Sequence, residues 1–251
     1  MKIVISEPYK NSEAQILDFL NDFEKGGELF GNGTRNQIKL FKLNGKEINI
    51  KSFQIPNPVN KVAYRFFRKS KARRSFEYAN ILISKSIGTP FPIGFVEETK
   101  GISFLKSFYI SEQLKSDLTY RNLVQEPDYP EHEEILRAFT RFTFQLHENN
   151  IEFLDHSPGN TLIQVNNGDY KFFLVDLNRM NFKKLTFEER MKNFSRLTPK
   201  KEMIEVMASE YAKCYKKKEK AVFNKMWFYT AKFQKKFHQK KELKKKLKFW
   251  E

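Results

Sequence analysis

The chain has 251 residues, a single cysteine and a formal net charge of +16. This length allows one large domain or two lobes with a substantial core, and the lone Cys214 excludes a disulfide framework. With no His or acid placed to activate it, we interpret Cys214 as a spare thiol. The N-terminal apolar run is too short for the pattern of a signal peptide, and no apolar run reaches about 18 residues, so we expect a cytoplasmic protein or one bound peripherally to the cytoplasmic side of a membrane.

The positive charge is concentrated at one end of the chain. Residues 213–251 contain fifteen Lys and three Glu, so +12 of the total +16 belongs to this segment. The rest of the chain is nearly balanced in charge. A basic partner surface, if the protein has one, is therefore a C-terminal feature.

The N-terminal part reads as a strand, a short helix and a β-hairpin. Ser12 and Gln15 have the spacing of a capping box before an amphipathic helix. Gly31 and Gly33 could let backbone amides approach a nucleotide phosphate, although the third glycine of a kinase loop is missing and an ordinary turn is the commoner meaning of this pattern. The Asn44-Gly45 pair between two alternating runs then predicts a tight hairpin.

A lysine and a glutamate follow that together suit a phosphate-positioning pair. Period-2 alternation puts Lys51 on the strand face opposite Ile48 and Ile50. Glu77 opens an amphipathic helix after a densely basic stretch, and it is the only acid between Glu47 and Glu97. In a kinase-type fold such a glutamate pairs with the strand lysine and holds it toward the α and β phosphates of ATP. Without the motifs downstream, Lys51 would be an ordinary solvated residue.

Two further strand-like runs lead into a predominantly helical region. The second run ends at Ser111-Glu112-Gln113, where a hinge between lobes would offer backbone groups, including those of Glu112, to adenine. An amphipathic helix is predicted over residues 131–148. We therefore predict an α+β, two-lobed, protein-kinase-like fold. Residues 1–110 form a β-rich N-lobe with one main helix, residues 111–212 form the core of a helical C-lobe, and residues 213–251 form a basic amphipathic helical segment.

The strongest chemical signal begins at Asp155. A loop forced by Pro158 and Gly159 follows it, and Asn160 then begins a strand that an Asn-Gly turn reverses toward Asp176. Kinase-type phosphotransferases use the same order of groups: a carboxylate that orients or deprotonates the attacking hydroxyl, then an Asn and an Asp that hold Mg²⁺ against the phosphates. This pattern predicts an ATP- and Mg²⁺-dependent phosphotransferase with an alcohol group as acceptor.

Four stretches of the chain resemble the lipopolysaccharide kinase family, the Kdo kinase and WaaP group. They are Leu154-Asp155-His156-Ser157-Pro158-Gly159-Asn160, Leu174-Val175-Asp176-Leu177-Asn178-Arg179-Met180, residues 65–75 and Thr89-Pro90-Phe91-Pro92-Ile93-Gly94. The similarity covers about residues 28–210. It implies a protein-kinase-like enzyme that uses ATP and Mg²⁺ to phosphorylate an inner-core sugar of lipopolysaccharide, most simply a Kdo residue, at the cytoplasmic face of the inner membrane.

The resemblance also implies roles for individual residues. Asp155 would be the catalytic base, Asn160 and Asp176 the metal ligands, and Lys51 with Glu77 the phosphate-positioning pair. Phe153 stands where related kinases carry His, and together with the thin glycine loop this leaves open a kinase-like binding module with weak catalysis. A kinase for another small hydroxyl substrate is a separate alternative.

The expected acceptor is small. Only nine residues separate Asp176 from a helix that Thr186 and Glu189 would cap, which leaves little platform for a peptide. Arg179 either meets an anionic group of the substrate, such as a Kdo carboxylate, or forms a salt bridge within its lobe.

The basic C-terminal segment has three possible partners. Apolar residues recur there at helical spacing among lysines, which is typical of helices that bind anionic membranes or glycolipids. The same face could simply pack on the lobe, and nucleic acid is the least favoured partner because no base-reading or stacking motif is present. The residues at this spacing are Met226, Thr230, Phe233, Phe237, Leu243, Leu247 and Trp250.

Overall fold

The computed structural model describes residues 1–31, 36–54, 68–101 and 103–248, and it divides them into two compact units. Unit 1 comprises Met1–Lys115 together with the three residues Asp176–Asn178, and unit 2 comprises Ser116–Val175 and Arg179–Glu251. The division falls five residues after the boundary that the sequence suggested. Residues 213–251 form no unit of their own but belong to unit 2.

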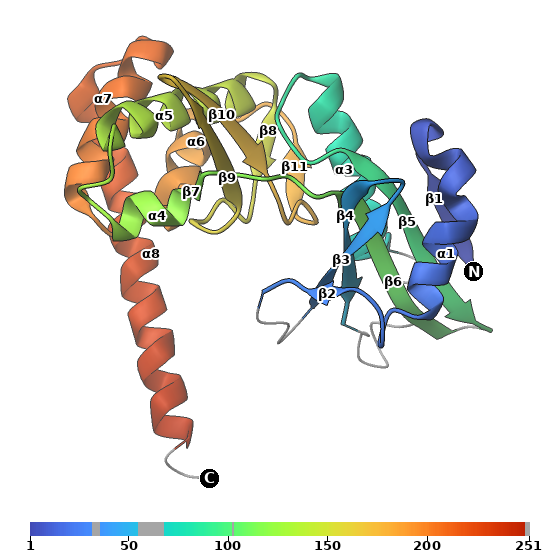
Figure 1. Cartoon of the computed structure of the whole chain (residues 1–251). Coiled ribbons are helices and arrows are strands. Elements are labelled where there is room, and N and C mark those ends of the chain that lie inside the picture. Colours follow the sequence, from blue (N-terminus) through green and yellow to red (C-terminus); the bar gives the residue numbers. More distant parts are fainter. Residues whose placement is uncertain (32–35, 55–67, 102, 249–251) are drawn as a thin grey trace. The chain divides into compact units, whose positions relative to one another are not determined.

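Unit 1 is built on a six-stranded antiparallel sheet, whose strand order is β1-β5-β6-β4-β3-β2 (Figure 1). Different helices pack on the two faces of this sheet. The strands are β1 (Lys2–Ile5), β2 (Glu28–Leu29), β3 (Gln37–Leu43), β4 (Lys46–Phe53), β5 (Pro92–Lys100) and β6 (Ser103–Glu112); the helices are η1 (Glu7–Ser12), α1 (Glu13–Asn21) and α3 (Lys71–Ser84).

Alternation along β4 separates two apolar clusters. Ile48 and Ile50 belong to a core that also contains residues of α1, whereas Phe53 packs with Ala72 of α3 on the other face. Lys51 shares the parity of Phe53, as the sequence pattern predicted. The strand therefore presents Lys51 on the face that α3 covers.

The tight hairpins form where Asn-Gly pairs occur. Asn44 and Gly45 both have positive φ, and so do Asn167 and Gly168 in unit 2. Two consecutive left-handed residues match the twist of the flanking strands, which explains the choice of Asn and Gly. The capping box at Ser12 is different: Ser12 precedes α1, but its hydroxyl accepts a hydrogen bond from Asn44 instead of capping the helix.

Unit 2 combines helices with two small sheets, whose strand orders are β10-β9-β7 and β11-β8. The strands are β7 (Leu118–Thr119), β8 (Ile151–Phe153), β9 (Thr161–Asn166), β10 (Asp169–Leu174) and β11 (Met180–Phe182); the helical elements are α4 (Tyr120–Gln125), α5 (His132–Glu148), α6 (Phe187–Asn193), η2 (Phe194–Arg196), α7 (Lys201–Tyr215) and α8 (Glu219–Lys248). Thr186 and Glu189 form the predicted capping box of α6.

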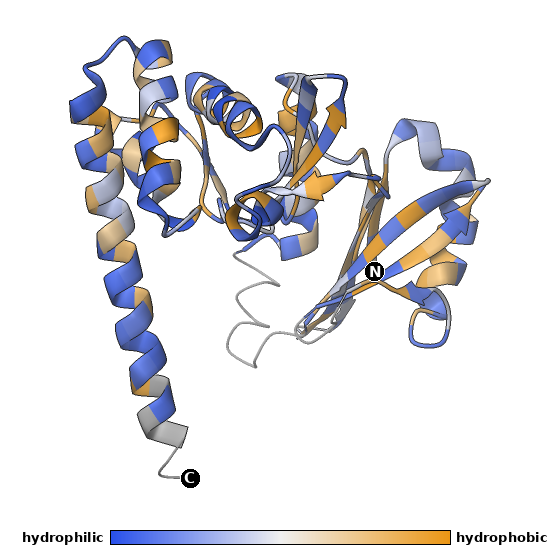
Figure 2. Cartoon of the chain, turned by 60° about the vertical axis from the view of Figure 1, so that its left-hand side comes forward, coloured by the Kyte–Doolittle hydropathy of each residue, from blue (hydrophilic) through white to orange (hydrophobic). Residues whose placement is uncertain are grey.

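Helix α8 has two halves with different environments. Val222, Met226 and Thr230 are buried against the unit, and Phe233 is half-buried. From Lys235 to Leu243 every residue is exposed, and Figure 2 shows hydrophilic colour predominating there. The predicted apolar stripe thus packs only along its first part; the side chains of Leu247 and Trp250 lie outside the described residues. In the described part of the chain, no helix is long and apolar enough to cross a membrane.

Candidate active site

The loop between β8 and β9 carries the predicted base. Asp155 lies two residues after β8, and its side chain is only 17% exposed. Arg179 and Arg196 both donate to its Oδ1, at 3.1 and 3.0 Å. The carboxylate is therefore held in one orientation by two cations, a contact that the residues near Asp155 in sequence do not reveal.

Main-chain contacts fix the same loop. Asn193 donates to the carbonyl oxygen of Phe153 at 2.8 Å, and Arg196 donates to that of Leu154 at 3.0 Å. Phe153, which stands where related kinases carry His, is fully buried and meets the ring of His156 edge-on. The loop thus has firm supports that do not depend on a histidine at position 153.

Two histidines at the loop are buried: His156, which is one of its residues, and His147 of α5. His156 is fully buried beside Phe139, and its Nδ1 has no hydrogen-bond partner among the described residues. Burial, followed by repulsion from His147 and Arg196, lowers the pKa of His156 to about 3. Burial likewise lowers the pKa of His147 to about 4, against an opposing hydrogen bond with Asn193. Both rings are neutral at pH 7, so neither adds charge beside Asp155.

Asn160 stands at the start of β9 and is tied back to the base. Its side-chain nitrogen donates to the carbonyl oxygen of Asp155 at 2.8 Å, which leaves the side-chain oxygen as the atom for a cation. The main-chain oxygen of Asn160 accepts from the amide of Val175, the residue before Asp176. The β9–β10 hairpin therefore ends where the sequence pattern placed it.

Asp176 lies in the segment that is grouped with unit 1. Its Oδ1 accepts from Lys51 at 2.7 Å and from Asn178 at 2.8 Å. Its φ of 59° is in the left-handed region, a strained conformation for a residue other than Gly that Asp and Asn tolerate best. Both contacts, with Lys51 and Asn178, are made by the same carboxylate oxygen.

The predicted pairing of Lys51 with Glu77 is not formed. Glu77 instead accepts from Lys69 at 2.7 Å and from Arg73 at 2.8 Å. Arg73 is one helical turn away and Lys69 just precedes the helix, so both reach Glu77 with little loss of freedom, while Lys51 is engaged by Asp176. Partial burial acts to raise the pKa of Glu77, but the two hydrogen bonds outweigh it and hold that pKa below its usual value.

The predicted nucleotide-binding residues lie on the edges of unit 1. Gly31 has a φ of 78° and follows β2, whereas Gly33 lies outside the described residues. Glu112 ends β6; its side chain accepts from the Tyr9 hydroxyl and its amide donates to Phe91 O. Both side-chain contacts of Glu112, with Tyr9 and Lys46, are made by the same oxygen, Oε1.

Asn160 of unit 2 and Asp176 of unit 1 each carry an oxygen of the kind that a hard cation takes as ligand. Among the described residues, no group of three or more His, Cys, Asp or Glu side chains is placed to hold a metal ion. Mg²⁺ commonly takes one or two protein oxygens and completes its shell with phosphates and water. The amide oxygen of Asn160 and a carboxylate oxygen of Asp176 are donors of that kind.

Comparisons with known proteins identify the family. The model of the Lipopolysaccharide kinase (Kdo/WaaP) family matches residues 55–217. A solved structure of WaaP in complex with acyl carrier protein aligns with a TM-score of 0.66 at 14% sequence identity, and covers 95% of this chain and 99% of that chain. No curated protein matches. The structural likeness shows a kinase-like fold with a sheet-rich N-terminal part and a helical C-terminal part. The family match covers more than half of the chain. It shows that this protein belongs to the lipopolysaccharide kinase (Kdo/WaaP) family of ATP-using phosphotransferases.

Proposed function

We propose that this kinase phosphorylates a hydroxyl of a Kdo residue in the inner core of lipopolysaccharide, with ATP and Mg²⁺ as cofactors. The observation that carries the proposal is the carboxylate of Asp155. This residue lies in the loop that ends at Asn160, and two arginines from outside the loop hold its carboxylate in one orientation. A base that is held in place before the substrate arrives loses little freedom at the moment of reaction.

The residues then have the following roles. Asp155 accepts the proton of the sugar hydroxyl while that oxygen bonds to the γ-phosphorus and the bond to the β,γ-bridging oxygen breaks, which releases ADP. Asn160 and Asp176 would hold Mg²⁺, which when bound neutralises charge on the β and γ phosphates. Lys51 exchanges its contact with Asp176 for the α and β phosphates, and the backbone at Gly31 and Glu112 faces the nucleotide.

Arg179 supports an anionic acceptor. Its side chain is 56% exposed, yet its guanidinium contacts Asp155, the group that must touch the acceptor hydroxyl. Kdo carries a carboxylate beside its hydroxyls, and a guanidinium binds a carboxylate with two parallel hydrogen bonds. We assign Arg179 to this carboxylate, which also explains why an exposed arginine stands at the base.

The test is transfer of phosphate to Kdo-lipid A. Incubation with Mg-ATP should increase the mass of the glycolipid by one phosphate group, and Asp155→Asn should abolish the transfer. Asp169→Asn, an exposed aspartate at the start of β10, is the matched control and should retain full activity. Transfer to other small alcohols but not to Kdo-lipid A would refute the substrate, and ATP binding without transfer to any acceptor would favour the kinase-like binding module.

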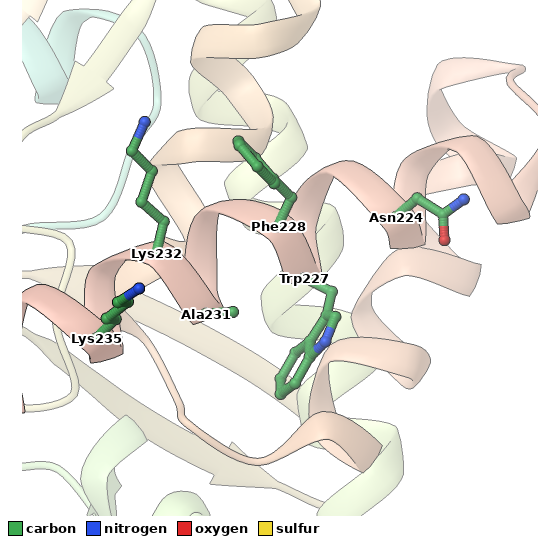
Figure 3. A pocket seen from close by; sticks show the side chains of 6 residues that line it. All are labelled: Asn224, Trp227, Phe228, Ala231, Lys232 and Lys235. Carbon is green, nitrogen blue, oxygen red and sulfur yellow. The ribbon is translucent and has the colours of Figure 1, made fainter.

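The outer half of α8 supports a membrane-facing role. Phe237 and Leu243 are 54% and 61% exposed among lysines. A pocket of about 650 Å³ further toward the helix start is lined by α8 residues and is not part of this surface; Figure 3 shows its Phe228 and Lys232 projecting from one side of the helix. Exposed apolar side chains among lysines fit the interface of an anionic bilayer, and we place the protein peripherally at the cytoplasmic face of the inner membrane.

Vesicle flotation tests this surface. Vesicles rich in phosphatidylglycerol should bind the protein, and vesicles of phosphatidylcholine alone should not. A double charge reversal, Lys240→Glu with Lys241→Glu, should release it, whereas the exposed Lys25→Glu in unit 1 should not. Unchanged binding by the double variant would refute the assignment. Binding to acyl carrier protein, with which WaaP forms the complex in the solved structure, without binding to vesicles would assign α8 to a protein partner instead.

A further inference from the structure

Arg196 makes three contacts that connect the catalytic loop with α8. One guanidinium nitrogen, Nη1, donates to Leu154 O and to Oδ1 of Asp155, both at 3.0 Å. The guanidinium carbon lies 5.8 Å from the centre of the Phe233 ring, which is the geometry of a cation–π contact. Arg196 thus holds both the main chain and the carboxylate of the loop while an aromatic ring of α8 lies against it.

Arg179 is attached to the same carboxylate in a weaker way. It reaches Asp155 through its side chain alone, at 3.1 Å, and that side chain is 56% exposed, against 37% for Arg196. The main-chain oxygen of Arg179 also accepts from the amide of Leu154, but its exposed guanidinium contacts Asp155 alone and can exchange partners when a substrate arrives. An arginine with three contacts cannot, so the two cations on Asp155 have separate tasks.

The position of Phe233 is set by the packed half of α8. Val222, Met226 and Thr230 bury one side of the helix, while Lys225 and Tyr229 both contact Glu188 of α6. Phe233 is less than one turn beyond Thr230, at the end of this packed half. The ring is therefore part of a fixed surface, and its contact with Arg196 is not a chance encounter of two mobile side chains.

We propose that Arg196 is a positioning residue for the base Asp155 and that Phe233 of α8 holds Arg196 in place. The packed half of the C-terminal helix is then part of the phosphotransfer machinery, and Phe233 also stacks on Phe237 of the outer half. This inference rests on the proposed role of Asp155 as the base.

Kinetics test the consequence for catalysis. Arg196→Ala should lower kcat by roughly 10²-fold with little change in KM for ATP, since a base displaced by about 1 Å costs that much. Arg196→Lys should recover part of the loss, and guanidinium salts added to Arg196→Ala should recover part of it as well. Phe233→Leu should lower kcat about fivefold, the size of one partly desolvated cation–π contact.

A matched control exists on the same helix. Phe228 is 53% exposed and has its own cation–π contact, with Lys232, so Phe228→Leu removes an equivalent pair away from the loop. It should leave kcat unchanged. Wild-type kcat in Arg196→Ala, a loss confined to KM, or equal losses in Phe228→Leu and Phe233→Leu would overturn the proposal.

Nuclear magnetic resonance separates this proposal from the function of the site. The Arg196 side-chain N–H signal should shift in Phe233→Leu, which removes the ring current, and again in Asp155→Asn, and it should not shift in Phe228→Leu. A signal that is unmoved in both variants overturns the contact, whatever the activity. If the signal moves as expected but the wild-type protein transfers no phosphate to Kdo-lipid A, the contact is supported and the proposed substrate fails.

Discussion

Acid should destabilise this protein through two buried histidines, His156 in the catalytic loop and His147 of α5. The pKa of His147 is lowered to about 4 and that of His156 to about 3, from an unfolded value of 6.5. Below pH 6.5 the two imidazoles bind protons in the unfolded chain but stay neutral in the folded protein. The free energy of unfolding therefore falls as the pH falls, and it levels off below the folded pKa values. At pH 5 each buried histidine should therefore lower the free energy of unfolding by about 2 kcal/mol relative to neutral pH, at roughly 1.36 kcal/mol per pH unit below 6.5.

Urea unfolding at pH 7.5, 6 and 5 measures this effect. Between pH 7.5 and 5 the wild type should lose about 2 kcal/mol more free energy of unfolding than His156→Phe. The variant lacks one of the two histidines that take up a proton on unfolding. Phe suits the site, since His156 is packed between Phe139 and Phe153. His238→Gln, on the exposed half of α8, is the control and should follow the wild type. Identical pH dependence in His156→Phe and the wild type would refute the reasoning.

Three further outcomes are expected. Gly94→Ala should lower the free energy of unfolding by about 2 kcal/mol or more in urea, because its new Cβ would lie 2.5 Å from Val4 O; a loss below about 0.5 kcal/mol would contradict this. Lys51→Met should abolish measurable phosphotransfer in the glycolipid assay and leave Asp176 without its cation, so retained kcat would argue against the role of Lys51. Glu77→Gln should have a much smaller effect on kcat than Lys51→Met, as it breaks contacts with two other cations; equal losses would mean that Glu77 joins Lys51 when nucleotide binds.

Local signals in the sequence predicted the elements that carry the site. The Asn44-Gly45 and Asn167-Gly168 pairs fixed two hairpins because each turn depends on two residues alone. The alternation of β4 placed Lys51 on the correct face, because successive side chains of a strand point to opposite faces of the sheet. The kinase-like fold and the family were predicted correctly, since they rest on several such elements in a fixed order.

Partner choice was harder to predict. Nothing beside Asp155 in the sequence indicates Arg196, which is 41 residues away. Glu77 contacts Lys69 and Arg73 in this structure because these two cations are nearer to it in sequence than Lys51. The burial of His147 and His156 was also missed, since burial depends on helices packed from distant parts of the chain. The roles given to Asn160 and the other site residues remain predictions.

Dissolved salt screens the lysines on the exposed half of α8, so their electrostatic effect does not reach the catalytic residue Asp155. At 1.5 Å of rise per residue, Lys241 lies about 12 Å along the axis from Phe233, beyond the Debye length of about 8 Å at physiological salt. Its lysines should speed encounters with an anionic surface without changing the potential at Asp155. Raising the ionic strength should therefore weaken surface capture while kcat for a detergent-dispersed acceptor stays constant, so one enzyme preparation can report the two halves of the helix independently.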